Sequence, residues 1–383
     1  MSEKENITLE QLFQRAYFFI TEGRIENALA TLEGISAERP EQKREIAYLR
    51  AWCHMLRERW DIAAQFILSA EVIDDPISDI STLGQTERRR RSYYILVLGN
   101  VAANLGRYEE AARHYIQCIK FLDERRMNDV RLRIKALCGL GMTHTVTGYF
   151  ANALDYYAEA LRLCGANTLD SNLPDIYYGL CDAHRHLGNL DQALKYGKEA
   201  LQLYIERSDR KRTCRMRNIL GRVYYQMGDF ASASSSYTEA LALAMSVESP
   251  GMVLNNFTAL ADLRLVEEKP GEARRFCELA LDYCKNVSQN HFVGMMYIVC
   301  GKVAEAQAKQ ASGRKASDFT AEAISFYKQA VDVLSSTEAR VELADAYGRL
   351  AQVLEDSGQQ GQALDYWRSA YSARSGPEES PLV

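Results

Sequence analysis

The segment LGMTHTVTGYFANALDYYAEAL (140–161) decides the fold, because its spacing recurs along the chain. It contains a small residue, six further residues, a glycine, and an alanine five positions after that glycine. A second small residue usually follows seven positions later. The same frame fits residues 98–119, 180–201 and 220–241. Self-similarity at a fixed period of about 40 residues is the signature of a repeat protein.

The frame extends to nine copies, two upstream and three downstream of these four. The glycine position reads Gly23, Glu58, Gly106, Gly148, Gly188, Gly228, Glu268 and Gly358 in eight of them, and the remaining copy begins at Gly301. The alanine position has no exception: Ala28, Ala63, Ala111, Ala153, Ala193, Ala233, Ala273, Ala323 and Ala363. Composition alone would not place alanine there nine times.

The spacing of the repeat predicts helices joined by tight turns. Apolar residues recur at spacings of 3 and 4, and no segment alternates in the manner of a strand. Glycine supplies the positive φ with which a helix ends, and small residues allow two helices to pack closely. Each copy is therefore predicted to be a helical hairpin. One hairpin cannot bury its apolar face alone, so we predict an all-α solenoid of about nine stacked hairpins.

The predicted solenoid is continuous over residues 9–374. It contains a long loop between two repeats at about 73–86 and an insert at about 308–319, within KQASGRKASDF. Short polar tails are expected at 1–8 and 375–383.

These motifs resemble the tetratricopeptide repeat. Besides the glycine and the alanines, the second helix carries that family's aromatic residue, as Tyr115, Tyr157, Tyr237, Tyr327 and Trp367. Gly197 and Cys277 replace it in two copies, and the family's proline survives only as Pro40. The length of about 40 residues is similar to the long-repeat variety of signalling adaptors and bacterial regulators. The resemblance implies a right-handed superhelix whose concave wall, formed by the first helix of each hairpin, binds other polypeptides.

Composition favours a cytoplasmic protein of this kind. The 383 residues carry a net charge of −5 and nine cysteines, an odd number without a CxxC pair, which argues against a disulfide framework. No run of 18 apolar residues is present, and the start MSEKENITLEQLF lacks the plan of a signal peptide. Walker, GxSxG and HExxH motifs are missing too, so we expect no enzyme and no cofactor.

The sequence CDAHRH (181–186) has the residue types of a metal site but not the spacing. His184 and His186 lie two residues apart and point to different faces of a helix, whereas chelation from one helix needs a spacing of 3 or 4. His184 also occupies a position that His54 and His144 fill in two other copies. We therefore interpret it as a packing residue, and Cys181 as one of the small residues of the frame.

The remaining candidate is a stripe along the first helices at i, i+3, i+7, i+10 and i+11, which is one helical face. Its polar members suit an extended peptide, because asparagine bonds both backbone donors and acceptors while arginine grips carboxylates. The alternative is a hydrated wall without a ligand. The candidate binding residues are Asn100, Asn104, Tyr178, Asp182, Arg185, His186, Arg215, Asn218, Arg222, Tyr225, Asn255 and Asp262.

Three kinds of function fit this wall: a scaffold or adaptor, a regulatory sensor that responds to a peptide, and an enzyme regulator or enzyme, for which no motif speaks. Basic stretches at 87–91, 131–135 and 207–217 raise a further alternative, a basic edge for an acidic partner or nucleic acid. A solvated edge paired with acids such as Glu87, Asp123 and Asp209 is favoured over it, and no interleaved aromatic residues indicate base stacking.

The C-terminal hairpin is not followed by a polar capping helix, although solenoid ends need one for solubility. Tyr366, Trp367 and Tyr371 are therefore expected to be partly exposed, and a homodimer or partner contact is expected at that end.

Overall fold

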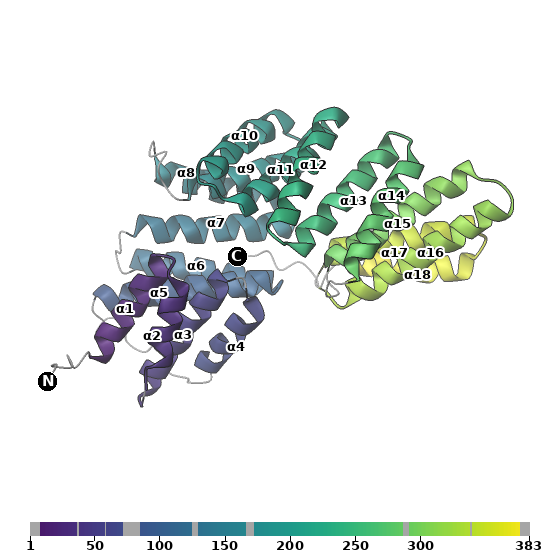
Figure 1. Ribbon diagram of the computed structural model, residues 1–383. Coiled ribbons are helices and arrows are strands. Elements are labelled where there is room, and N and C mark those ends of the chain that lie inside the picture. Colours follow the sequence, from purple (N-terminus) through teal and green to yellow (C-terminus); the bar gives the residue numbers. More distant parts are fainter. Residues whose placement is uncertain are drawn as a thin grey trace. The chain divides into compact units, whose positions relative to one another are not determined.

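A computed structural model describes residues 8–36, 38–57, 59–71, 85–124, 129–165, 172–285, 291–337 and 339–375. Every regular element in these ranges is a helix (Figure 1). The chain divides into two compact units, Met1–Asn172 and Leu173–Val383, and each is described by itself. No helix in the described ranges is both long and apolar enough to cross a membrane.

The helices pair into consecutive hairpins, as the repeat predicts. The first unit contains α1 (Leu9–Thr21), α2 (Ile25–Glu33), α3 (Pro40–Leu56), α4 (Trp60–Glu71), α5 (Gln85–Asn104), α6 (Tyr108–Glu124), α7 (Val130–Val146) and α8 (Phe150–Cys164). The second contains α9 (Leu173–His186), α10 (Leu190–Glu206), α11 (Arg210–Gln226), α12 (Phe230–Ser246), α13 (Pro250–Val266), α14 (Pro270–Cys284), α15 (His291–Gln310), α16 (Arg314–Ser335), α17 (Arg340–Asp356) and α18 (Gln360–Ser375).

The turn inside each hairpin confirms the role assigned to glycine. Gly188 has a φ of 77°, its N–H donates to Arg185 O, and the next N–H, of Asn189, donates to His184 O. These two bonds form a Schellman motif, which satisfies the last carbonyls of the first helix. Glu268 adopts the same left-handed conformation, with a φ of 59°, where the repeat lacks glycine. Glu58, at the corresponding place in another hairpin, lies outside the described residues.

The nine repeat alanines are all buried, none more than 2% exposed. Small residues of the first helix likewise face the aromatic ring of the second. Gly141 lies against Tyr157, and a Cβ atom at that glycine would approach Tyr157 Cζ to 2.7 Å. Gly99, Gly221 and Gly301 make the same close contact with Tyr115, Tyr237 and Tyr327, so the core of these four hairpins is a contact between a glycine and a ring.

The hairpin of α9 and α10, one of those that lack the aromatic residue, has its larger side chain on the first helix. Gly197 stands at the aromatic position of α10, and the first helix there carries Cys181 instead of glycine. A Cβ atom at Gly197 would lie 2.6 Å from Leu220 Cδ2 and 3.0 Å from Cys181 Sγ. Leu220 and Cys181 therefore occupy the space beside Gly197 in place of a ring.

Successive hairpins contact mainly through the second helix of one and the first helix of the next, as α10 with α11, α12 with α13 and α16 with α17, and to a lesser extent through their first helices. In the second unit α9 packs on α11, α11 on α13, α13 on α15 and α15 on α17, and α1, α3, α5 and α7 pack likewise in the first. No two second helices of the described ranges make comparable contact. Within each unit the first helices therefore lie on the inner side of the stack.

The expected insert at 308–319 is helical over most of its length. It extends α15 to Gln310 and begins α16 at Arg314, so only a short turn through Gly313 remains between them. The expected loop at 73–86 lies outside the described residues, apart from its last two positions, which open α5. Both expected tails also lie outside them, except for Thr8, which caps α1, and Ser375, which ends α18.

Candidate functional site

One position on the first helices of the second unit carries charges of alternating sign. Asp182 on α9, Arg222 on α11, Asp262 on α13 and Lys302 on α15 follow one another at intervals of 40 residues. Lys302 was not among the residues predicted from the sequence, although the same interval from Asp262 would have found it. These four positions define the charged row around which the site is built.

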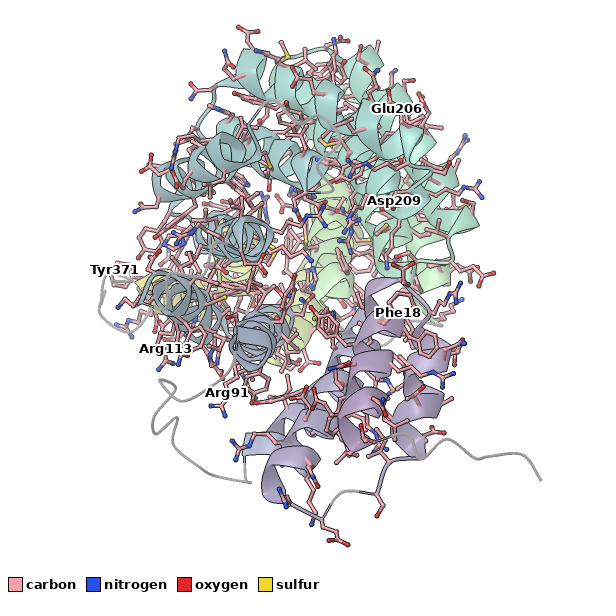
Figure 2. All side chains as sticks on the ribbon, turned by 90° about the vertical axis from the view of Figure 1, so that its left-hand side faces the viewer. Phe18, Arg91, Arg113, Glu206, Asp209 and Tyr371 are labelled. Atoms are coloured by element: carbon pink, nitrogen blue, oxygen red, sulfur yellow. The ribbon has the colours of Figure 1, made fainter. Side chains whose placement is uncertain are left out.

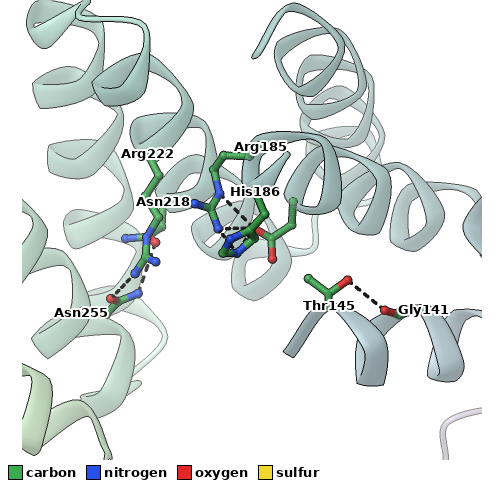
Figure 3. Close-up of polar contacts among 8 residues, drawn as sticks. Gly141, Thr145, Arg185, His186, Asn218, Arg222 and Asn255 are labelled. Atoms are coloured by element: carbon green, nitrogen blue, oxygen red, sulfur yellow. Dashed lines mark hydrogen bonds and ion pairs between the residues drawn. The ribbon is translucent and has the colours of Figure 1, made fainter. Parts of the chain in front are cut away.

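At the α9 end of the row, Asp182 is held by its own helix. Arg185 donates to Asp182 Oδ1 through Nη2 at 2.6 Å and through Nε at 3.0 Å (Figure 3). Arg185 is only 7% exposed, and its contact with a ligand stays a prediction. These two N–H bonds to one carboxylate oxygen compensate the burial, because a buried guanidinium must be matched by a carboxylate.

His186 is the exposed member of this group. Its Nε2 lies 2.5 Å from Arg185 Nη2 and 3.8 Å from Asp182 Oδ1. Partial burial, with the positive charges of Arg185 and Arg222, lowers the pKa of His186, against the opposing effect of Asp182. The imidazole is therefore neutral at neutral pH, and because arginine only donates, His186 Nε2 is the acceptor in its contact with Arg185.

A relay of side-chain amides connects α11 with α13. Arg222 Nη2 donates to Asn255 Oδ1 at 3.0 Å, and Asn255 Nδ2 donates to Asn218 Oδ1 at 3.2 Å. Asn218 Nδ2 donates in turn to Asn256 Oδ1 at 2.9 Å, and Asn256 donates to Met252 O. Figure 3 shows the part of the relay that joins Arg222, Asn255 and Asn218.

The burial along the relay divides its members into two kinds. Asn218 and Asn256 are 4% and 1% exposed, whereas Arg222 and Asn255 are half-buried at the surface. Asn218 was predicted to line the groove; its Nδ2 and Oδ1 bond Asn256 and Asn255 between the helices, and its contact with a ligand stays a prediction. Asn256 lies one residue beyond the predicted stripe, so the sequence pattern alone did not suggest it as the partner.

Arg222 differs from the other three charges of the row because no carboxylate pairs with it within the described chain. Asp182 is matched by Arg185, and Lys302 Nζ lies 3.0 Å from Asp262 Oδ1. Arg222 has only the neutral oxygen of Asn255, which fixes its direction without cancelling its charge. Arg215, two turns earlier on α11, is exposed and likewise forms no ion pair there.

Two tyrosines flank the row. Tyr178 on α9 is half-exposed, and burial together with the negative charge of Asp182 raises its pKa to about 12, against the effect of Arg215 and Arg222. Tyr225 on α11 is also half-exposed, and burial and Asp262 raise its pKa. Both phenols are therefore protonated at neutral pH and available as donors.

The first unit presents a different inner face. Asn100 is half-buried, accepts from Tyr115 Oη at 2.8 Å and donates to Met55 Sδ. Asn104 is exposed and donates to the carbonyl of Asn100 in its own helix. On α7, Thr145 stands at the position that Arg185 has on α9. The Thr145 hydroxyl donates to Gly141 O in its own helix (Figure 3). On α5 the positions equivalent to Asp182 and Arg185 are Asn100 and Ala103, so this helix lacks the arginine–carboxylate pair of α9.

The three histidines of the shared position pack against second helices, which confirms their interpretation as packing residues. His54 stacks on Phe66 at 5.4 Å between ring centroids, and His184 stacks on Tyr196 at 5.7 Å. His144 lies 5.0 Å from Tyr156. Cys181 is fully buried in the core of its hairpin, and no group of three potential metal ligands occurs within the described residues.

Several charges of the basic stretches are matched inside their own unit. Arg133 pairs with Asp123, Arg217 lies 2.5 Å from Glu239, and Arg212 contacts both Asp175 and Asp209. Asp209 also caps α11 through the N–H of Arg212. Basic residues that pair with neighbouring acids in this way are typical of a solvated edge. The side chains of 87–90 lie outside the described ones.

Comparison with known proteins places this geometry among repeat proteins. Residues 92–121 and 172–246 each match a model of the tetratricopeptide repeat. None of the curated proteins compared with the chain matches it.

Solved structures of low sequence identity share the fold over nearly the whole length. A Rap protein complexed with Competence and Sporulation Factor has a TM-score of 0.72 at 12% identity, over 96% of this chain and 97% of that one. NprR in complex with its cognate peptide NprX has a TM-score of 0.63 at 13% identity, over 95% and 98%. Aspartyl phosphate phosphatase F from Bacillus subtilis has a TM-score of 0.58 at 9% identity, over 98% and 96%.

Proposed function

The chain is a tetratricopeptide-repeat protein, and from this premise we propose that the inner face of its second unit binds an extended polypeptide without catalysing a reaction. The observation that carries the proposal is Arg222. A half-buried guanidinium that is oriented by a neutral amide, and matched by no carboxylate among the described residues, is prepared for an anionic group of a ligand.

The neighbouring groups supply the other contacts that a peptide needs. Asn255 retains acceptor capacity at the surface, and the phenols of Tyr178 and Tyr225 can donate to backbone carbonyls. The buried pair Asn218 and Asn256 holds α11 against α13, so these groups are fixed before binding. Such pre-organisation lowers the entropy cost of association. The occupant expected from this chemistry is an extended peptide with a carboxylate.

A second candidate function is a sensor that responds to its peptide. Its support is the likeness over nearly the full length to NprR, whose structure was determined with a cognate peptide. An adaptor would keep one conformation with and without ligand, whereas a sensor would change the relation between its hairpins. Small-angle scattering of the full chain with and without a bound peptide separates the two candidates.

The peptide itself can be found by selecting a library of random peptides against the full-length protein. We expect selected peptides to be rich in Asp and Glu, and to bind the Arg222→Gln variant about tenfold or more weakly, since a charged hydrogen bond contributes about 1.5–3 kcal/mol. Arg210→Gln is the matched control, because Arg210 is an exposed arginine at the start of the same helix. Equal loss in both variants, or none in either, would contradict the proposal.

A further inference from the structure

A pocket of about 540 Å³ lies between the last helices of the second unit, α15, α17 and α18. It is lined by Glu305, Ala344, Asp345, Gly348, Arg349, Gln352, Trp367, Ala370 and Tyr371. None of these residues belongs to the peptide-binding face on α9, α11 and α13. The pocket is therefore distinct from the proposed peptide site.

One wall of the pocket is aromatic. Trp367 and Tyr371 lie one turn apart on α18 and so share a face of that helix. Trp367 is 40% exposed and Tyr371 is 77% exposed. Tyr371 is labelled in Figure 2. A Cβ atom at Gly348 would lie 3.5 Å from Trp367 Cζ3, so the indole rests beside a position that carries no side chain. The space that Gly348 leaves open is part of the pocket.

The opposite wall carries an excess of negative charge. Asp345 Oδ2 accepts from Arg349 Nε at 3.0 Å, which matches one carboxylate with the one guanidinium of the lining. Glu305 accepts from the neutral Tyr327 hydroxyl and forms no ion pair with a described cation. The Trp367 indole N–H also points to a carboxylate, that of Glu355, at 3.3 Å. The lining thus has two acids against one base, and its aromatic wall adds further negative potential at the ring face.

A cation is the ligand that such a pair of walls recognises, because a ring face and a carboxylate both attract positive charge. A guanidinium fits better than an ammonium, since it is flat, weakly hydrated, stacks on indole and bonds a carboxylate through two N–H groups. The pocket is also large enough for the whole side chain that carries it. We propose that this pocket binds the guanidinium of an arginine side chain in a partner polypeptide, between Trp367 and Glu305.

The test uses the full-length protein with N-acetyl-arginine amide as the probe and the indole N–H resonance of Trp367 as the readout. The chain has three tryptophans, and the Trp367→Phe variant identifies the resonance. We expect a saturable shift with the arginine probe and a weaker one with N-acetyl-lysine amide. The uncharged analogue N-acetyl-citrulline amide should not produce it. An equal response to citrulline, or no saturable response to arginine, would overturn the proposal.

Two variants test the walls separately. Glu305→Gln keeps an acceptor for Tyr327 but removes the charge, and should weaken arginine binding by about threefold or more. Gly348→Leu should fill the space beside the indole and abolish binding without changing any charge. Asp191→Asn removes an exposed carboxylate elsewhere in the unit and should have no effect. Arginine binding that survives both Glu305→Gln and Gly348→Leu, in variants with unchanged circular dichroism, would place the probe elsewhere and overturn the proposal.

Discussion

The ring of Tyr237 occupies the space that a side chain on Gly221 would need. A Cβ atom at Gly221 would lie 2.5 Å from Tyr237 Cε1, and the ring is only 3% exposed, so it has no room to move away. Gly221→Ala should therefore lower the free energy of unfolding by about 1–3 kcal/mol, the usual cost of overpacking a core. Urea unfolding followed by circular dichroism measures the change.

Gly348 gives the matched control, since it also lies inside a first helix of the same unit. A Cβ atom there meets only Trp367, at an ordinary contact distance of 3.5 Å. Gly348→Ala should raise the free energy of unfolding by about 0.5–1 kcal/mol, because alanine loses less backbone entropy in a helix. Equal effects of the two substitutions would mean that the contact between glycine and ring does not control packing.

His184 should make the protein less stable in mild acid. Burial lowers its pKa in the folded state, so below about pH 6.5 the unfolded chain takes up a proton that the folded chain does not. The contribution is complete above the unfolded pKa and is lost as the pH falls towards the folded one. His184→Phe keeps the stacking on Tyr196 and removes a buried Nδ1 that has no hydrogen-bond partner. It should preserve stability at neutral pH and reduce the loss in acid.

His144 occupies the same repeat position and supplies the contrast. Its Nδ1 lies 2.9 Å from Leu140 O, so His144→Phe removes a hydrogen bond and leaves a carbonyl without it. That variant should lose about 0.5–1.5 kcal/mol at neutral pH, where His184→Phe loses little. Unfolding curves at neutral pH and in mild acid test both variants. If His184→Phe loses as much stability in acid as the unchanged protein, His184 does not cause the acid sensitivity.

The amide relay predicts that two neighbouring asparagines play different parts. Asn218→Ala leaves Asn256 Oδ1 buried without its donor, and should cost about 1–3 kcal/mol of stability. Asn255→Ala changes a half-exposed residue and should mainly weaken peptide binding. Calorimetric melting and peptide titration of both variants separate the effects, and a similar loss of stability in the two would contradict the division.

The repeat frame was sufficient to predict the fold, because each of its positions has one physical task. The alanine positions are buried, the glycine of each described hairpin turn has a positive φ, and the shared histidine position packs on the second helix. The sequence shows that glycine replaces the aromatic residue at position 197, but it does not show which residues fill the space of the missing ring. The closer packing at Gly197 depends on Leu220 in the next hairpin. The pattern of residues within one repeat does not predict a contact between two repeats.

The candidate site was less predictable for a similar reason. Periodicity identifies the face of a helix, and Tyr178, Asp182, Arg222 and Asn255 do lie on the accessible face of their helices. Periodicity does not show which polar residues on that face already bond to a neighbouring side chain. Arg185 pairs with Asp182 one turn away, and Asn218 donates a hydrogen bond to Asn256 of the next hairpin. Asn256 comes within hydrogen-bonding distance of Asn218 only after α11 and α13 have packed, whereas the contact of Arg185 with Asp182 forms within α9.

Binding of an acidic peptide should be accompanied by uptake of a proton. The pKa of His186 is lowered in the free protein by burial, Arg185 and Arg222, while Asp182 acts in the opposite direction. A ligand carboxylate beside Arg222 would favour the charged imidazole and raise that pKa. Affinity should therefore rise as the pH falls from about 8 towards about 6. Calorimetric titrations in buffers of different ionisation enthalpy measure the proton uptake, and His186→Gln should abolish it.

The most direct test of the central claim is amide hydrogen exchange of the full-length protein, with and without a saturating selected peptide. If the inner face of the second unit is the binding site, added protection should concentrate in α9, α11 and α13, around Asp182, Arg222 and Asp262. The second helices α10, α12 and α14 should change little. Protection confined to those second helices, or to the first unit, would contradict the account.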